Sequence, residues 1–260
     1  MKRATQNTPS IQSLDRGLVI LEAVAKSSEP VPLGELTELL GIDRSSVFRL
    51  ANTLKRRGFL ANPSGRKDYI LGPSVWRLST QYDWSNMLIT LCHEHVKSMA
   101  GQIKETAHLA VREGKQALFI DHASVNHMIA VTGQTGELVP LYCTAHGKAL
   151  LTDLDARDLQ ALFGADPLHS YTERTITSIK RLAQECTQIK TQGFATDDSE
   201  FQDGIRCVAA PIRDKDGRVV ASIGISAPTS RFPKDRIPEH SAKVVEVAQQ
   251  ISVILTSQGD

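Results

Sequence analysis

Two short helical patterns joined by Gly41-Ile42-Asp43 constrain the fold of this chain more than any other stretch of its sequence. Residues 33–40 carry leucines at helical spacing, and Gly41 can end that helix in the left-handed conformation. Asp43 can cap the next helix. The buried stripe of that second helix is Val47, Leu50, Ala51 and Leu54. Since an amphipathic pattern over 13–26 supplies a preceding helix, we predict a helix-turn-helix unit.

The exposed face of the second helix carries side chains that can donate to phosphates and hydrogen-bond base edges. These expected DNA contacts are Arg44, Ser45, Ser46, Arg49, Asn52 and Arg56. Two strand-like runs follow, 59–61 and 69–71, around a turn with Arg66 and Lys67 at its tip. Each of these elements, taken alone, would also fit a three-helix core with solvated surface arginines. A helix, a glycine turn, a polar and basic helix and a basic hairpin follow one another in this order, which favours a winged helix that binds double-stranded DNA. Arg66 and Lys67 would then contact phosphate.

The total charge conceals this basic region. The chain has 30 Lys and Arg against 29 Asp and Glu, a net charge of +1, which taken alone argues against a nucleic-acid partner. Residues 1–75 hold 11 basic and 7 acidic side chains, whereas the remaining 185 residues hold 19 and 22. Such asymmetry indicates a basic module attached to a mildly acidic one.

The same sequence predicts a cytoplasmic chain. Its four cysteines form no C-x-x-C pair, so neither a disulfide framework nor a zinc ribbon is indicated. No apolar run approaches the roughly 18–20 residues of a membrane span, and the first residues lack the apolar stretch of a secretory signal. We therefore expect no membrane partner.

Beyond residue 75, strand-like and helical patterns alternate, which predicts a sheet with helices on its faces. Expected strands are 108–112, 117–123, 128–132, 206–213 and 218–226, the last two joined by an Asp-Gly turn. Expected helices begin at Pro73 and near residue 85, and span 147–153, 156–163, 179–192 and 237–255. The junction at 82–85 is the expected domain boundary. Trp76 and Trp84 beside it fit either a dimer contact or packing within one chain.

Several blocks in a fixed order, spread over residues 11–257, resemble the IclR family of bacterial transcriptional regulators. In the first part they are 13–21, 33–36, 41–50 and 69–72; in the second, 140–151, 193–200, 204–212 and 223–228. The resemblance implies a winged helix-turn-helix domain (1–72), a linker helix (73–84) and an effector-binding and oligomerisation domain (85–260). The last would be an α/β domain related to GAF and PAS sensors, with a mixed or antiparallel sheet. Proteins of this family are homodimers or homotetramers that bind operator DNA at catabolic genes and respond to small organic acids. For this chain, the resemblance favours a repressor over an activator.

The resemblance also places a ligand pocket in the second domain. Its positions are Ala145, Gly147, Asp197, Ile205, Cys207 and Ser226. The backbone N–H groups at a helix start near Ala145 and Gly147 favour a ligand with a carboxylate. The alternative to a pocket role is that Asp197 makes a hydrogen bond at the end of a strand and that Ser226 is an ordinary strand residue. Two departures from the family pattern, Gly224 for a serine and Tyr142-Cys143 for a histidine and a small residue, favour a bulkier aromatic or sugar acid over glyoxylate.

No catalytic, metal or cofactor site is indicated. Cys207 has no neighbouring His or Asn pattern to activate it, and 224–228 lacks the final glycine of a nucleophile elbow. Cys92 and His95 share a helix face but have no further ligands at useful spacing. Two alternatives stay open: a GAF-like enzyme with an appended DNA-binding module, and an architectural DNA-binding protein without a ligand. Saturable stabilisation by an organic acid would separate these from the regulator.

Overall fold

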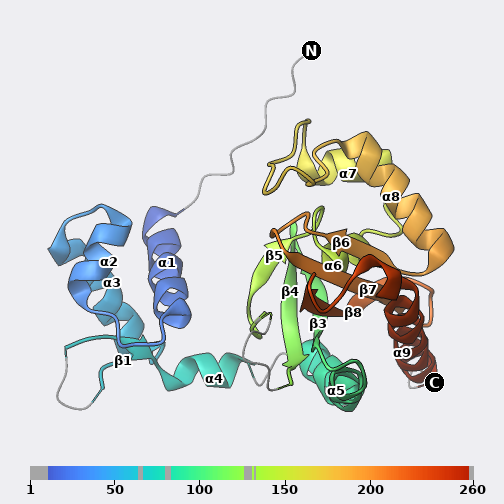
Figure 1. Cartoon of the computed structure of the whole chain (residues 1–260). Helices are drawn as coiled ribbons and strands as arrows, with labels where there is room; N and C mark the ends of the chain where they lie inside the picture. The colour runs from blue at the N-terminus through green and yellow to red at the C-terminus, as the bar shows by residue number, and fades with distance from the viewer. Residues whose placement is uncertain (1–10, 64–66, 80–82, 126–130, 132, 258–260) are drawn as a thin grey trace. The chain divides into compact units, whose positions relative to one another are not determined.

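The computed structural model describes residues 11–63, 67–79, 83–125, 131 and 133–257, with the backbone alone for 83–86. The chain forms two compact units, Met1–Trp84 and Ser85–Asp260 (Figure 1). Each has its own hydrophobic core and is described separately. Within the described ranges, no helix has the length and apolar character needed to cross a membrane.

Three helices form the centre of the N-terminal unit: α1 (Gln12–Lys26), α2 (Leu33–Leu40) and α3 (Arg44–Arg56). Gly41 follows α2 at φ +59°, a left-handed conformation that suits glycine, and its N–H donates to the Thr37 carbonyl. Asp43 caps α3 by accepting from the Ser46 N–H at 2.9 Å. The helix-turn-helix prediction is confirmed, including both of these turn residues.

A small hairpin and a short helix complete this unit. Strands β1 (Leu60–Ala61) and β2 (Ile70–Leu71) pair antiparallel, and α4 (Pro73–Ser79) follows. Proline is tolerated at this first helical position because the N–H it lacks has no partner within the helix there. The buried core of the unit consists of Ile20, Val24, Val31, Leu36, Val47, Ala51, Leu60 and Tyr69.

The C-terminal unit is built on one six-stranded antiparallel sheet of order β5-β4-β3-β8-β7-β6. Its strands are β3 (Thr106–Glu113), β4 (Gln116–Ala123), β5 (Leu138–Pro140), β6 (Ala195–Asp198), β7 (Ile205–Arg213) and β8 (Val219–Pro228). Tight turns at Gly114 (φ +56°) and Gly217 (φ +77°) join β3 to β4 and β7 to β8. The predicted α/β domain with an antiparallel sheet is therefore confirmed.

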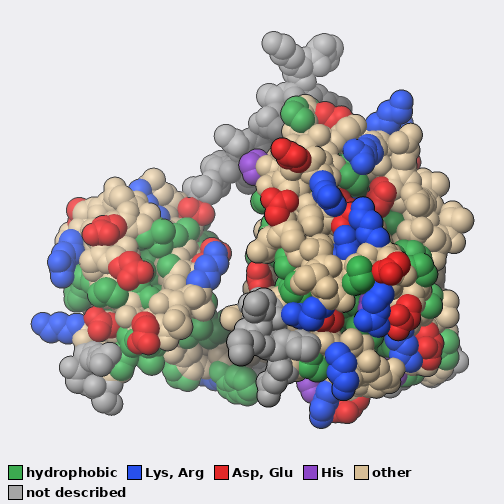
Figure 2. All heavy atoms as spheres, in the orientation of Figure 1, with side chains coloured by type: hydrophobic (Ala, Val, Ile, Leu, Met, Phe, Trp, Pro, Cys, Tyr) green, Lys and Arg blue, Asp and Glu red, His purple; other side chains and the backbone are tan. Residues whose placement is uncertain are grey.

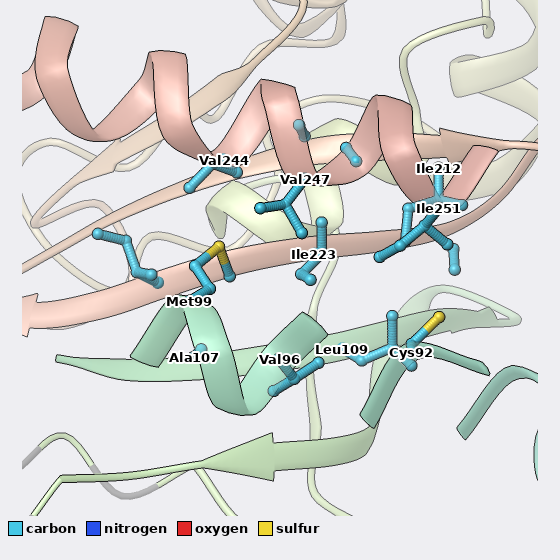
Figure 3. Packing of buried hydrophobic residues seen from close by; sticks show 14 of the residues in the cluster. Cys92, Val96, Met99, Ala107, Leu109, Ile212, Ile223, Val244, Val247 and Ile251 are labelled. Atoms are coloured by element: carbon cyan, nitrogen blue, oxygen red, sulfur yellow. The ribbon is translucent and has the colours of Figure 1, made fainter. Parts of the chain in front are cut away.

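Helices cover both faces of this sheet. On one face, α5 (Asp83–Ile103) and α9 (Ile237–Ser257) pack on alternate residues of the central strands, such as Leu109 and Ile223 (Figure 3). On the other face, α6 (Ala145–Leu150) packs on Cys207 and Ala209 of β7. Because side chains alternate along a strand, these two sets point to opposite sides of the sheet. Helices α7 (Ala156–Phe163) and α8 (Ile179–Gln192) join α6 in a further hydrophobic cluster.

The structure differs from the sequence expectations at helix α6 and at strands β5 and β6. The helix expected over 147–153 is α6, which begins earlier because Thr144 caps it by accepting from the Gly147 N–H. Strands β5 and β6 were not expected. The strand expected over 128–132 lies outside the described residues except for Val131, which is not in a strand. Trp76 of α4 is 73% exposed, so it is not packed within its own unit.

Candidate functional site: a DNA-reading helix and a buried effector cavity

The cap of α3 engages two of the residues expected to contact DNA. The Ser45 hydroxyl donates to Asp43 Oδ1 at 2.5 Å, and the Ser46 N–H donates to the same oxygen. These hydrogen bonds, the Ser45 hydroxyl foremost, hold the pKa of Asp43 well below its usual range. Arg49 extends the network, since its Nη2 donates to Ser46 Oγ at 3.1 Å. The first turn of α3 is therefore tied together by side chains that also lie at its surface.

The outward face of α3 matches the one expected from the sequence. Val47 and Ala51 are buried, whereas the side chains on the opposite side are exposed. The exposed set is Arg44, Ser45, Arg49, Asn52 and Arg56, with Ser46 half-buried at its edge. A continuous polar and basic helix face of this kind can enter a major groove.

A groove beside α3 joins this face to the hairpin. Arg44, Asn52 and Lys55 of α3 line it together with Lys67 of the hairpin. The sequence reasoning missed Lys55, although its spacing of three residues from Asn52 places both on one side of the helix. The hairpin base is held by Asn62, whose Nδ2 donates to the Asp68 carbonyl at 2.7 Å. Arg66, the other expected phosphate contact, lies outside the described residues.

The second candidate site is a cavity of about 340 Å³ between the sheet and the start of α6. Five of the six expected effector residues line it: Ala145, Asp197, Ile205, Cys207 and Ser226. Three of them lie in a row across neighbouring strands, because Asp197 of β6 pairs with Cys207 of β7, which pairs with Ser226 of β8. Phe119, Val139 and Phe201 add apolar wall. This mixture of apolar surface and a few polar groups is typical of small-molecule sites.

Asp197 is the most deeply buried carboxyl group in the cavity wall, at 3% exposure. Its Oδ1 accepts from the Glu200 backbone N–H at 2.7 Å. Burial raises the pKa of Asp197 from 3.8 to about 7, with the Glu200 charge acting in the same direction and Lys148 opposing it. Near neutral pH this group is therefore divided between its acid and its carboxylate.

Two histidines missed by the sequence reasoning also line the cavity. His108 of β3 is 1% exposed, and neither of its ring nitrogens makes a hydrogen bond of good geometry within the described ranges, although the Gly133 backbone lies close enough to act on its pKa. His146 of α6 is equally buried; its Nδ1 lies 3.0 Å from Ser222 Oγ, while Nε2 is unpartnered among those residues. Burial lowers the pKa of His108 to about 4 and that of His146 to about 3. Both rings are neutral at pH 7, so each offers one donor and one acceptor.

Gly147, one of the expected effector residues, lies near the start of α6 but does not line the cavity, and the Tyr142 side chain makes its contacts elsewhere. Gly147 is not among the lining residues; a Cβ there would lie 2.2 Å from the Leu141 carbonyl oxygen, so the glycine allows α6 to pack closely on the preceding turn. The Tyr142 hydroxyl donates to the His169 carbonyl at 2.7 Å, and its ring packs on Phe163. The phenol therefore gives no support for a bulkier ligand.

Behind the cavity, Lys148 of α6 is fully buried between two carboxylates. Its Nζ donates to Glu200 Oε1 at 2.6 Å and to Glu185 Oε1 of α8 at 3.2 Å. The pKa of Lys148 is raised because these two carboxylates outweigh its desolvation. This ion pair network connects α6, α8 and the turn after β6.

Cys207 places a thiol in the cavity wall. Burial raises the pKa of the Cys207 thiol, which keeps it protonated and unreactive. Among the described residues, no group of three or more His, Cys, Asp or Glu side chains is arranged to hold a metal ion.

Comparisons with known proteins agree over nearly the whole chain. The model of the IclR helix-turn-helix domain matches residues 13–63, and that of the bacterial transcriptional regulator IclR C-terminal matches 81–253. The transcriptional repressor IclR of Escherichia coli is 30% identical over 248 residues, covering 95% of this chain and 90% of the relative. The regulator KdgR of the same species is 29% identical over 94% of this chain and 92% of its own length.

Solved structures give the same result. The IclR protein of Thermotoga maritima has a TM-score of 0.72 at 26% identity, covering 95% of this chain and 99% of its own. An IclR homologue from Microbacterium hydrocarbonoxydans, solved with 4-hydroxybenzoate, has a TM-score of 0.80 over 94% of this chain and 98% of its own. Because the Microbacterium protein is only 19% identical to this chain, its similarity is evidence of a shared fold alone.

Proposed function

Since the chain belongs to the IclR family of bacterial transcriptional regulators, we propose that it is a repressor of catabolic genes controlled by a small organic acid. The observation that carries this proposal is the combination of two features in one chain. One is an exposed polar and basic helix face next to a basic hairpin, and the other is a buried cavity with unpartnered polar groups. Enzymatic turnover forms no part of the proposal, because the matched relatives are named as repressors and regulators.

The DNA contacts of the proposal are divided by chemistry. Arg49 and Asn52, near the middle of the exposed face, read base edges, since both side chains can form bidentate hydrogen bonds to purines. Arg44, Lys55 and Lys67, which line the groove beside α3, contact phosphate, as does Arg66. Ser45, Ser46 and Arg56 complete the contacts. In a homodimer or homotetramer, two such helices would lie about 34 Å apart, one DNA turn, or a multiple of it.

The effector of the proposal is an aromatic or sugar acid. The cavity volume of about 340 Å³ lies in the range of ligand pockets and leaves room for more than a two-carbon acid. Asp197, Cys207 and Ser226 supply hydrogen bonds, and Ile205 and Phe201 supply apolar contact. The effector changes DNA affinity only if it binds the DNA-competent and DNA-free arrangements with different affinity.

Thermal unfolding of the full chain with single acids tests the effector. We would use benzoate, 4-hydroxybenzoate, gluconate, pyruvate and glyoxylate, each titrated to a concentration well above its Kd. At about 100 times Kd, a bound acid stabilises the folded state by about 2.7 kcal/mol. A saturable rise of the unfolding midpoint with benzoate or gluconate is the expected result. Stabilisation by none of the acids would favour an architectural DNA-binding protein without an effector.

A further inference from the structure

Among the described residues that line it, the effector cavity has carboxyl groups but no lysine or arginine to balance an incoming acid. Asp197 lies in its wall and Glu137 at its exposed rim, while no lysine or arginine is among the described residues that line it. Residues 124–136, which contain the undescribed stretch around Val131, include no lysine or arginine either. The two lining histidines, His108 and His146, are kept neutral by burial.

The charged side chains nearest the cavity are already paired. Lys148 does not line it, and its ammonium group is held between Glu200 and Glu185. On the outer side of β6, Asp198 binds Arg206 and Lys234. Figure 2 likewise shows Lys and Arg interspersed with Asp and Glu over the visible face of this unit. No positive charge is therefore left over for a ligand among these groups.

Several described groups interact electrostatically with Asp197: Lys148 of α6, Glu200 after β6, Cys143 before α6 and Cys207 of β7. His108 of β3 and His146 of α6 line the same cavity. Glu185 of α8 lies behind Lys148. Cys143 and Cys207 are protonated, because burial raises the pKa of each thiol. Asp197 is the group of this set that lines the cavity wall and whose pKa is raised into the range pH 5.5–8, to about 7.

Two carboxylates cannot share a buried site while both are ionised, because their repulsion raises the proton affinity of the pair. Sharing one proton converts the repulsion into a short, charge-assisted O–H···O hydrogen bond. Resting on the acid effector proposed above, we infer that Asp197 receives the effector's carboxylate in its protonated form, so that each acid enters the cavity together with one proton.

Uptake of a proton with each acid makes the regulator sensitive to pH as well as to its effector. The raised pKa of Asp197, about 7, means that the acid form is abundant below neutrality and scarce at pH 8. Acid binding therefore weakens as the pH rises above 7, by up to about tenfold per unit for one linked proton. An acidified cell would release the repressor at a lower effector concentration.

Calorimetry tests the inference directly. The full chain is titrated with benzoate, gluconate, pyruvate and glyoxylate at pH 5.5 and pH 8, in pairs of buffers that differ in ionisation enthalpy. For an acid that binds, we expect uptake of about one proton at pH 8 and close to none at pH 5.5. Asp197→Asn keeps a neutral hydrogen-bond donor at this position, so its binding should show neither proton uptake nor pH dependence.

The matched control is Asp203→Asn, an exposed carboxylate near the same strands that does not line the cavity; it should retain the wild-type proton uptake. Binding without proton uptake at pH 8 in the wild type, or undiminished uptake in Asp197→Asn, overturns the inference while leaving the acid effector intact. If no acid binds at either pH, the acid-effector proposal fails and the inference falls with it. Should Asp197→Asn not fold, the wild-type uptake at the two pH values decides alone.

Discussion

At the scale of single residues, local chemistry indicated which side chains to consider but not where they point. Asp197, Cys207 and Ser226 lie in one row because of strand pairing, which no local pattern specifies. On sequence grounds the Tyr142 phenol favoured a bulkier ligand, yet its hydroxyl donates to the His169 carbonyl. His108 and His146 were missed because an isolated histidine in an apolar stretch is usually part of a core; an unpartnered ring nitrogen, visible only in three dimensions, distinguishes them.

At position 224 only a glycine fits, because the neighbouring strand leaves no room for a side chain. A Cβ at this position would lie 2.4 Å from the Val208 carbonyl oxygen and 2.7 Å from Ala209 Cβ. We predict that Gly224→Ser, which would restore the family's second serine, lowers the free energy of unfolding by about 1–3 kcal/mol through overpacking. Gly101→Ala is the control, since nothing lies within 4 Å of its Cβ and alanine favours a helix. Urea unfolding measures both; an unchanged Gly224→Ser would refute the close packing.

The raised pKa of Asp197 should also be visible without a ligand, in the pH dependence of the stability of the folded chain. Its pKa is about 7 in the folded chain and near 3.8 when unfolded, so the folded state holds a proton that the unfolded state releases. Its contribution to stability is complete below pH 3.8 and is lost as the pH rises through 7. We predict that Asp197→Asn gains stability relative to the wild type as the pH rises from about 4 to about 7, and that the difference is constant above about pH 8. Parallel melting curves for the two proteins over this range would contradict the raised pKa.

At the scale of elements, helix bounds followed closely from caps and turn residues. The expected ranges for α2, α7 and α8 agree with the structure because Gly41, Asp155 and Gly193 act locally on the backbone. Strand β5, only three residues long, carries no such signal and exists through pairing with β4. Short strands with distant partners are therefore the part of the fold that sequence alone could not predict.

The buried Lys148 network ties α6 to α8, and we expect it to be sensitive to the loss of one partner. Lys148→Met leaves Glu200 buried beside Glu185 without a cation, which should lower the free energy of unfolding by about 3–5 kcal/mol. Adding Glu200→Gln removes one of the stranded charges and should recover part of that loss. Chemical denaturation of the two single variants and the double variant gives the coupling. Additive effects would show that these side chains do not act as a pair.

At the scale of the whole molecule, the near-zero net charge describes two units with different chemistry. The basic residues of the first unit gather on α3 and beside the hairpin, whereas those of the second are paired with carboxylates such as Asp153, Asp198 and Glu105. Segment composition therefore separated the unit that carries the helix-turn-helix from the unit that carries the cavity. The sheet order, which brings β3 beside β8 and so assembles the cavity, could not be predicted because it depends on contacts more than 100 residues apart.

The most direct test of the central claim is the selection of genomic DNA fragments by the purified full chain, followed by sequencing and titration of the enriched site. We predict a two-fold symmetric motif that binds in the nanomolar range, is released by the stabilising acid, and is bound about 1–3 kcal/mol more weakly by Arg49→Ala. Recovery of fragments without a shared motif, with affinity indifferent to both the acid and Arg49, would contradict an effector-controlled repressor.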